Sequence, residues 1–131
     1  MMIMAIAAGA VAAALFLALM STVGLHRDKG FYAALLIAIA FFYPVFSAER
    51  FDIDGALFQL LYAMPFVLIA MIGYRREPGL LATGLLFHAS FDVLGLLFGF
   101  HAPELWAELC IGFDLVLALA ARVFLQGSTK H

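Results

Sequence analysis

The sequence predicts an all-α fold, a polytopic membrane helix bundle with five transmembrane helices that form a single domain over residues 1–131. Two observations favour this fold. Hydrophobic residues make up 66% of the chain and charged residues 12%, with a mean hydropathy of +1.10, whereas soluble domains are about 45–50% apolar and about 25% charged. The apolar residues also form long continuous runs, unlike the alternating strands of a membrane β-barrel. We therefore expect the lipid bilayer to surround this chain.

Clusters of charged and turn residues divide the chain into five apolar segments, each near the roughly 20 residues that cross a bilayer. The expected helices cover residues 3–25, 31–47, 56–74, 80–100 and 105–125. The first is rich in alanine and ends before the cluster HRDKG. Charged residues at 49–54 and 75–77 close the second and third, and a turn with His101, Pro103 and Glu104 separates the last two.

The basic residues predict how these helices are oriented. Six of the seven lysines and arginines fall on one side of the expected bundle, and only Arg50 falls on the other. The six are Arg27, Lys29, Arg75, Arg76, Arg122 and Lys130. Because cytoplasmic loops carry the excess of basic residues, we expect a multi-pass protein of the cell inner membrane with its N-terminus outside and its C-terminus inside. A secretory signal begins with a basic region, and residues 1–25 contain no Lys or Arg, so we expect the first segment to be a resident helix.

Charge and cysteine content exclude two classes of function. The net charge of -2 and the pI near 6.0 argue against nucleic acid as a partner, because nucleic-acid binding needs a clustered basic face. Cys110 is the single cysteine of the chain. An internal disulfide and redox chemistry by paired cysteines are therefore excluded.

Two of the expected helices carry ionisable residues in the middle of apolar sequence. In the stretch LLATGLLFHASFDVLGLLFGF, His88 and Asp92 are one turn apart and so share a helix face. In the next segment, Cys110 and Asp114 have the same spacing. The two segments should be antiparallel, and Asp92 and Asp114 are equally far in sequence from Pro103, so we expect the two aspartates at about the same depth in the bilayer.

Small residues continue both polar faces, and small residues let membrane helices approach closely. They are Gly84, Gly95 and Gly99 in one helix and Ala107, Ala118 and Ala121 in the other. If the two stripes face each other, His88, Asp92 and Asp114 form a buried polar cluster. The stripes could instead face a second copy of the chain, and the sequence leaves both arrangements open.

The energetics favour a functional role for this cluster over a purely structural one. An aspartate at the centre of a membrane helix costs about 2.5–3.5 kcal/mol on insertion, whereas a hydrogen bond between membrane helices contributes only about 0.6 kcal/mol. Two carboxylates close together in a low dielectric cannot both ionise comfortably. We therefore expect Asp92 and Asp114 to share a proton in a relay that His88 tunes. Simple tethering of the two helices is the alternative.

Metal binding by the same cluster is a second hypothesis. One imidazole and two carboxylates can hold zinc or iron. These ligands span more than one helical turn, which fits a metal less well than the residue types do. We therefore expect no cofactor, with zinc or iron at His88, Asp92 and Asp114 as the alternative.

Further polar residues are candidates for ligand binding. The expected ligand-binding residues are Tyr43, Gln59, Tyr62 and Cys110. The two tyrosines and the glutamine lie in the outer halves of the second and third segments, where they could line a cavity above Asp114. Pro44 and Pro65 fall inside these segments and should kink them.

From Tyr32 onward, the chain resembles a family of small bacterial integral-membrane proteins of unknown function. The resemblance rests on FHASFD at residues 87–92, on the turn with His101 and Pro103, and on the series Trp106, Cys110, Asp114. Members of that family have two tryptophans after the turn, where this chain has Leu105 and Trp106. The family carries no established activity, so the resemblance supports the site residues and implies no substrate.

The leading functional prediction is proton-linked binding or transport of a small molecule at the cluster. One alternative is a membrane-embedded enzyme that acts on a lipid or isoprenoid-like substrate by acid–base or metal-assisted chemistry. Another is an accessory subunit of a larger membrane complex. Whether the protein is an enzyme stays open. Because five helices make a thin wall for a transport path, we expect a homo-oligomer or a larger membrane complex.

Overall fold

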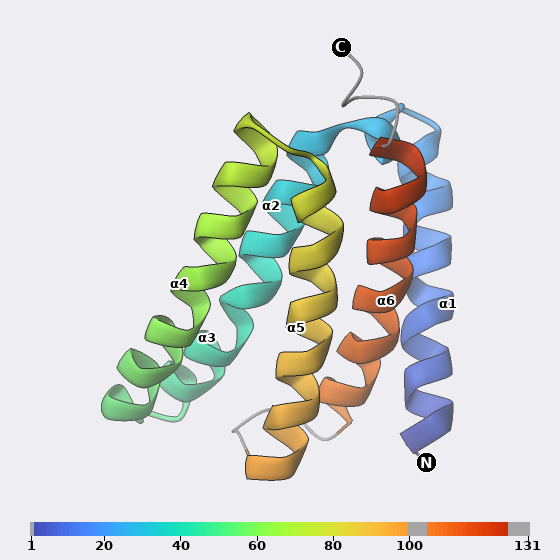
Figure 1. Ribbon diagram of the computed structural model, residues 1–131. Helices are drawn as coiled ribbons and strands as arrows, with labels where there is room; N and C mark the ends of the chain where they lie inside the picture. The colour runs from blue at the N-terminus through green and yellow to red at the C-terminus, as the bar shows by residue number, and fades with distance from the viewer. Residues whose placement is uncertain (1, 100–104, 126–131) are drawn as a thin grey trace.

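The computed structural model describes residues 2–99 and 105–125, and within these ranges it is helical and contains no strand. The helices are α1 (Met2–Ser21), α2 (Lys29–Ala40), α3 (Phe42–Glu49), α4 (Ile53–Arg75), α5 (Gly79–Phe98) and α6 (Trp106–Leu125). A short 3-10 turn at Leu25–Arg27 joins α1 to α2 (Figure 1). The all-α fold class predicted from the sequence is therefore confirmed.

Among the helix boundaries that differ from the sequence prediction are the end of α1 and the starts of α2 and α4. α1 ends at Ser21 rather than at residue 25, and the chain then turns through Gly24, whose φ of 82° suits glycine. α2 and α4 begin earlier than expected because two aspartates cap them. The Asp28 carboxylate accepts a hydrogen bond from the backbone N–H of Gly30 at 2.8 Å, and the Asp52 carboxylate accepts one from Gly55 at 3.0 Å.

The expected second helix is divided into α2 and α3 at Phe41. Pro44 has no backbone N–H, so the carbonyl group of Ala40 lacks its helical partner. The bond pattern is regained one residue later, where the Val45 N–H donates to the Phe41 carbonyl at 3.1 Å. Pro65, in contrast, lies inside α4 without dividing it.

The helices pass up and down, and α5 lies in the middle (Figure 1). α5 packs against α6 on one side and against α2 and α4 on the other. α1 packs along α6, where Gly9 and Gly112 allow a close approach of the two backbones. A Cβ atom on Gly9 would overlap the Leu109 carbonyl, and one on Gly112 would overlap the Ile6 carbonyl. α6 therefore packs against α1 as well as against α5.

Four stretches are long and apolar enough to cross a membrane, which indicates an integral membrane protein. They are Met2–Ser21, Lys29–Glu49, Ile53–Arg75 and Gly79–Phe98. α6 also has 20 residues, but it contains three charged residues, Glu108, Asp114 and Arg122. By length and composition alone it is therefore not among the candidate spans. Large apolar side chains cover the outside of the bundle, including Leu97 and Phe98, each 73% exposed. A lipid environment explains such a surface.

Candidate functional site

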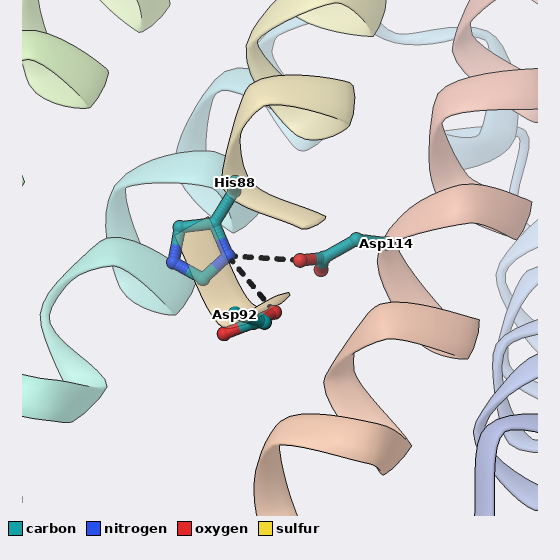
Figure 2. A group of neighbouring side chains, drawn as sticks. All are labelled: His88, Asp92 and Asp114. Carbon is teal, nitrogen blue, oxygen red and sulfur yellow. Dashed lines mark hydrogen bonds and ion pairs between the residues drawn. The ribbon is translucent and has the colours of Figure 1, made fainter. Parts of the chain in front are cut away.

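Three ionisable side chains meet where α5 faces α6. His88 and Asp92 extend from successive turns of α5, and Asp114 reaches across from α6 (Figure 2). Their exposed fractions are 1% for His88 and 0% for both aspartates. Of the two arrangements that the sequence left open, the structure therefore shows the one in which the polar residues of α5 and α6 meet within a single chain.

One ring nitrogen of His88, Nδ1, lies close to the carboxylates of both Asp92 and Asp114. Nδ1 of His88 lies 2.8 Å from Oδ2 of Asp114, which is hydrogen-bond distance. The same nitrogen lies 3.5 Å from Oδ2 of Asp92 (Figure 2). Because Nδ1 carries at most one proton, only one of the two carboxylates can accept that proton at a time. The shorter distance makes Asp114 the closer hydrogen-bond partner of this nitrogen, and the tautomer of His88 sets which of the two groups donates.

Tyr43 completes the cluster from α3. Its hydroxyl group donates a hydrogen bond to Oδ1 of Asp92 at 2.9 Å, and the side chain is 2% exposed. The sequence pointed to Tyr43 only as a residue lining a cavity. In the structure, the Tyr43 hydroxyl group contacts the Asp92 carboxylate directly. Asp92 therefore lies near both Tyr43 and His88, whereas His88 is the hydrogen-bond partner of Asp114.

Aromatic rings enclose the other face of the imidazole. The centroid of the His88 ring lies 5.0 Å from that of Phe66 in α4 and 5.9 Å from that of Phe91 in α5. Among the described residues, Nε2 of His88 has no hydrogen-bond partner, and the same holds for Oδ1 of Asp114. Buried polar atoms without partners are uncommon in folded proteins. The cluster therefore has hydrogen-bonding capacity that the described residues do not use.

A cavity of about 350 Å³ adjoins the cluster on the α6 side. It lies between α1, α2 and α6 and is mostly apolar, and Asp114 is one of its lining residues. Cys110 and Trp106 line it as well, one and two turns before Asp114 on α6. Cys110, which the sequence analysis named as a ligand-binding candidate, thus lies beside this cavity. Ligand binding by Cys110 stays a prediction.

Gln59 and Tyr62 lie elsewhere. Gln59 is buried in α4, 8% exposed, and does not line the cavity that contains Asp114. Tyr62 is 43% exposed, and its ring packs against those of Phe58 and Phe91. The sequence places both residues in the outer half of the third expected helix, and neither of them lines the cavity that contains Asp114. The predicted turn with His101, Pro103 and Glu104 falls outside the described residues.

The stripe of glycines on α5 does not face α6 along its whole length. A Cβ atom on Gly84 would contact side chains of Leu36 in α2 and Ile69 in α4. Thus Gly84 lets α2 and α4 approach α5, whereas the polar residues further along α5 meet α6. Helical periodicity predicts a shared face correctly, but it cannot say which neighbour each part of that face meets.

The cluster also meets a geometric condition for holding a metal ion. One ligand atom from each of His88, Asp92 and Asp114 lies within 4.8 Å of the others. Imidazole nitrogen and carboxylate oxygen suit zinc and ferrous iron. A metal-ligating histidine, however, nearly always has a polar partner on its other nitrogen, and Nε2 of His88 has none among the described residues. The residue types fit a metal better than their surroundings do.

No protein-family model, curated protein or solved structure matches the chain. The resemblance at residues 87–92 therefore stays a prediction, and the class of the protein follows from its own fold and site. It is a membrane-type helix bundle with a buried His88, Asp92 and Asp114 group.

Proposed function

We propose that the chain binds a small molecule and links this binding to proton exchange at the His88–Asp92–Asp114 cluster. One observation carries the proposal: three ionisable side chains lie in contact, almost fully buried, beside a cavity large enough for a ligand. Ionisable groups inside membrane helices cost free energy on insertion, and in other membrane proteins they mark proton relays or ion and substrate pathways. A tether between α5 and α6 would need only neutral hydrogen-bonding groups.

The distances around Nδ1 of His88 support proton exchange rather than a fixed ion pair. His88 Nδ1 faces both carboxylates, and the two distances differ by less than 1 Å. A small rotation of the imidazole would therefore exchange its preferred partner. Two neighbouring carboxylates in a low dielectric hold a shared proton readily, and the Tyr43 hydroxyl supports Asp92 when His88 turns to Asp114. Any ligand that adds charge beside Asp114 should shift this balance.

The proposed topology has five spans, with α6 as the fifth. Its Glu108 and Arg122 lie in the first and last turns, where they can reach the bilayer surfaces, and α5 covers Asp114. The basic residues of the described elements lie mainly in the 3-10 turn after α1, at the start of α2 and at the ends of α4 and α6. This distribution supports an inner-membrane protein with its N-terminus outside and its C-terminus inside.

We also propose that the protein works as a homo-oligomer or within a larger membrane complex. α1 packs mainly against α6, and most of its surface is exposed. A second copy or a partner helix could cover that surface. Blue-native electrophoresis and crosslinking in membranes test this point: a single species with the mass of one chain would contradict it.

Transport in liposomes tests the proposed function. Wild-type protein and an Asp92→Asn variant would be reconstituted and incubated with a cellular metabolite extract, with and without an imposed pH gradient, and the liposome contents analysed by mass spectrometry. We expect at least one solute to accumulate only with the gradient and only with wild-type protein. Identical contents for both proteins would contradict proton-linked transport. A new lipid species that requires Asp92 would instead support the enzyme hypothesis.

A metalloenzyme is the second candidate function, favoured by the proximity of the three ligand atoms. Bound metal in detergent-purified protein, measured by mass spectrometry for wild type, Asp92→Asn and Asp114→Asn, separates the two candidates. Near-stoichiometric zinc or iron that is lost in both variants would support metal-assisted chemistry. Absence of metal from the wild-type protein would remove this candidate.

A further inference from the structure

The cavity between α1, α2 and α6 presents only apolar surface from the described residues. Two of its lining residues, Trp106 and Asp114, carry nitrogen or oxygen in their side chains. The indole nitrogen of Trp106 is buried, and so is Oδ1 of Asp114. Oδ2 of Asp114 lies against His88, at 2.8 Å. Both lining residues therefore present carbon to the cavity, and its described walls contain no group that would bind a charge or a polar head group.

The cavity lies near the middle of the apolar spans. Its lining residues fall within 9–16 on α1 and within 35–42 on the α2–α3 segment, close to the centres of Met2–Ser21 and Lys29–Glu49. These stretches cover about 10–12 Å along the helix axes. Because the hydrocarbon core of a bilayer is about 30 Å thick, lipid head groups lie above and below the cavity, and lipid chains surround it.

The dimensions of the cavity suit one hydrocarbon chain. α1 and α2 both contact α6 but pack little against each other. Ala12 and Ala38 line the cavity from these two helices and are exposed, so the cavity is open between them. Its volume of about 350 Å³, spread over about 11 Å of helix axis, gives a mean width of about 6 Å. A helix with its side chains is about 10–12 Å across, whereas a chain of methylene groups is little thicker than one carbon–carbon contact of about 4 Å.

We infer that the cavity binds one hydrocarbon chain of a bilayer lipid, which enters from the membrane between α1 and α2 and packs along α6. This inference rests on the proposed function in taking the cavity as the ligand site, and it names the class of ligand: a molecule held by its apolar chain. Lipid tails are as apolar as the walls, so packing contacts hold the chain in place. An empty cavity would leave Phe16, Phe42 and Phe113 without those contacts.

Other occupants fit the cavity less well. A helix from a second copy is wider than the space between α1 and α2. Water needs two or more polar partners in a buried site, and a polar ligand would lose its hydrogen bonds to water without replacement. The walls therefore select a chain and are indifferent to the head group that the chain carries.

Trp106 can report the occupant, because it is the single tryptophan of the chain and lines the cavity. The protein would be purified in a detergent with a rigid steroid body and no flexible chain. It would then be titrated with phosphatidylcholine that carries bromine in the middle of its chains, since bromine quenches tryptophan fluorescence on contact. The same lipid without bromine gives the reference. We expect saturable quenching in the wild-type protein. Its absence would overturn the inference.

The head group of the probe tests what the cavity recognises. Phosphatidylglycerol with the same brominated chains adds a net negative charge but leaves the chain unchanged. We expect its half-saturating concentration to lie within about threefold of that of phosphatidylcholine, because the head groups stay outside the middle of the hydrocarbon core. A larger difference would show that a polar site outside the cavity selects the lipid, and would overturn the inference.

Two substitutions fill the cavity from different walls. Ala12→Phe on α1 and Ala38→Phe on α2 should each lower the quenching by at least about threefold, because a close-packed cavity has no room for both a phenyl ring and a lipid chain. Ala8→Phe and Ala34→Phe are the matched controls and should quench like the wild type. Each lies one turn earlier on the same helix, is exposed and does not line the cavity. Undiminished quenching in either filled variant, with native helical content, would contradict the placement. The second variant decides if the first fails to fold.

The outcomes separate this inference from the proposed function. If the brominated chain binds as expected but the carboxylates show no shared proton, the cavity is a lipid site without proton linkage and only the proposed function fails. If the carboxylates share a proton but the chain does not bind, the proton centre stands and the ligand class is wrong.

Discussion

Nδ1 of His88 lies 2.8 Å from Oδ2 of Asp114, although 26 positions separate the two residues in the chain. This contact joins α5 to α6 at a buried point and brings Asp92 into the same group. It also leaves the second oxygen of Asp114 free for another donor. The pair therefore connects the packing of the bundle to the chemistry proposed for it.

The His88–Asp114 contact should be energetically coupled. We expect the effects of His88→Ala and Asp114→Ala on the free energy of unfolding to be non-additive by more than about 1 kcal/mol, above the roughly 0.6 kcal/mol average for hydrogen bonds between membrane helices. Equilibrium unfolding in mixed micelles measures the four proteins of this cycle. His88→Ala combined with Ser90→Ala is the control, because Ser90 is exposed on α5. Additive effects of His88→Ala and Asp114→Ala would show that the contact contributes no coupling energy to stability.

The Tyr43 hydroxyl should stabilise the fold through Asp92. Tyr43→Phe keeps the ring that packs against Phe46 and Phe91 but removes the donor to Oδ1 of Asp92. We expect a loss of about 1 kcal/mol in the free energy of unfolding, the typical contribution of one hydrogen bond. Tyr74→Phe is the matched control, since Tyr74 is 47% exposed and keeps its ring contact with Lys29. Equal stability of Tyr43→Phe and wild type would argue against this bond.

The α1–α6 contact should depend on the absence of a side chain at Gly112. Gly112→Ala places a Cβ atom against the backbone carbonyl of Ile6. We expect the variant to lose about 1–3 kcal/mol, as overpacked sites do. Gly79→Ala provides the control, because a Cβ atom there meets nothing within 4 Å. If both variants unfolded at the same denaturant concentration, the close approach of α1 and α6 would be wrong.

The proposed orientation can be tested with single cysteines in a Cys110→Ala background. Lys29→Cys lies at the end of the bundle assigned to the cytoplasm, and Glu49→Cys lies at the opposite end of the α2–α3 segment. We expect a membrane-impermeant maleimide to label Glu49→Cys in intact cells and to label Lys29→Cys only after the membrane is opened. The reverse pattern would invert the topology, and labelling of both in intact cells would show that the segment does not span the membrane.

Much of the site could be predicted from the sequence because local periodicity determines it. The spacing of His88 and Asp92 places them on one face, and the equal distance of Asp92 and Asp114 from Pro103 predicts a common depth. The structure agrees with both, since Oδ2 atoms of both aspartates reach the same ring nitrogen. These predictions need only the geometry of a helical hairpin.

Contacts between helices distant in sequence could not be predicted in this way. The sequence does not show that Tyr43 reaches Asp92, because this depends on the break at Phe41 and on the path of α3. Gln59 and Tyr62, which the sequence offered as cavity-lining residues, are not among the residues that line the cavity with Asp114. The packing of α1 on α6 did leave a signal, since Ala5, Gly9 and Ala13 recur every fourth residue and all are buried. Small residues at that spacing are typical of close membrane helix pairs.

The central claim is that Asp92 and Asp114 share a proton beside His88. Infrared spectroscopy of the protein in liposomes measures it most directly, through the carbonyl stretch of a protonated carboxylic acid as the pH is raised from neutral to alkaline. We predict a protonated-carboxyl band at neutral pH that disappears as the pH rises and is missing or displaced in Asp92→Asn and Asp114→Asn. Asp54→Asn is the control and should keep the band, because Asp54 lies in the exposed first turn of α4. No such band in the wild-type protein, or a band unaffected by both cluster variants, would contradict the account.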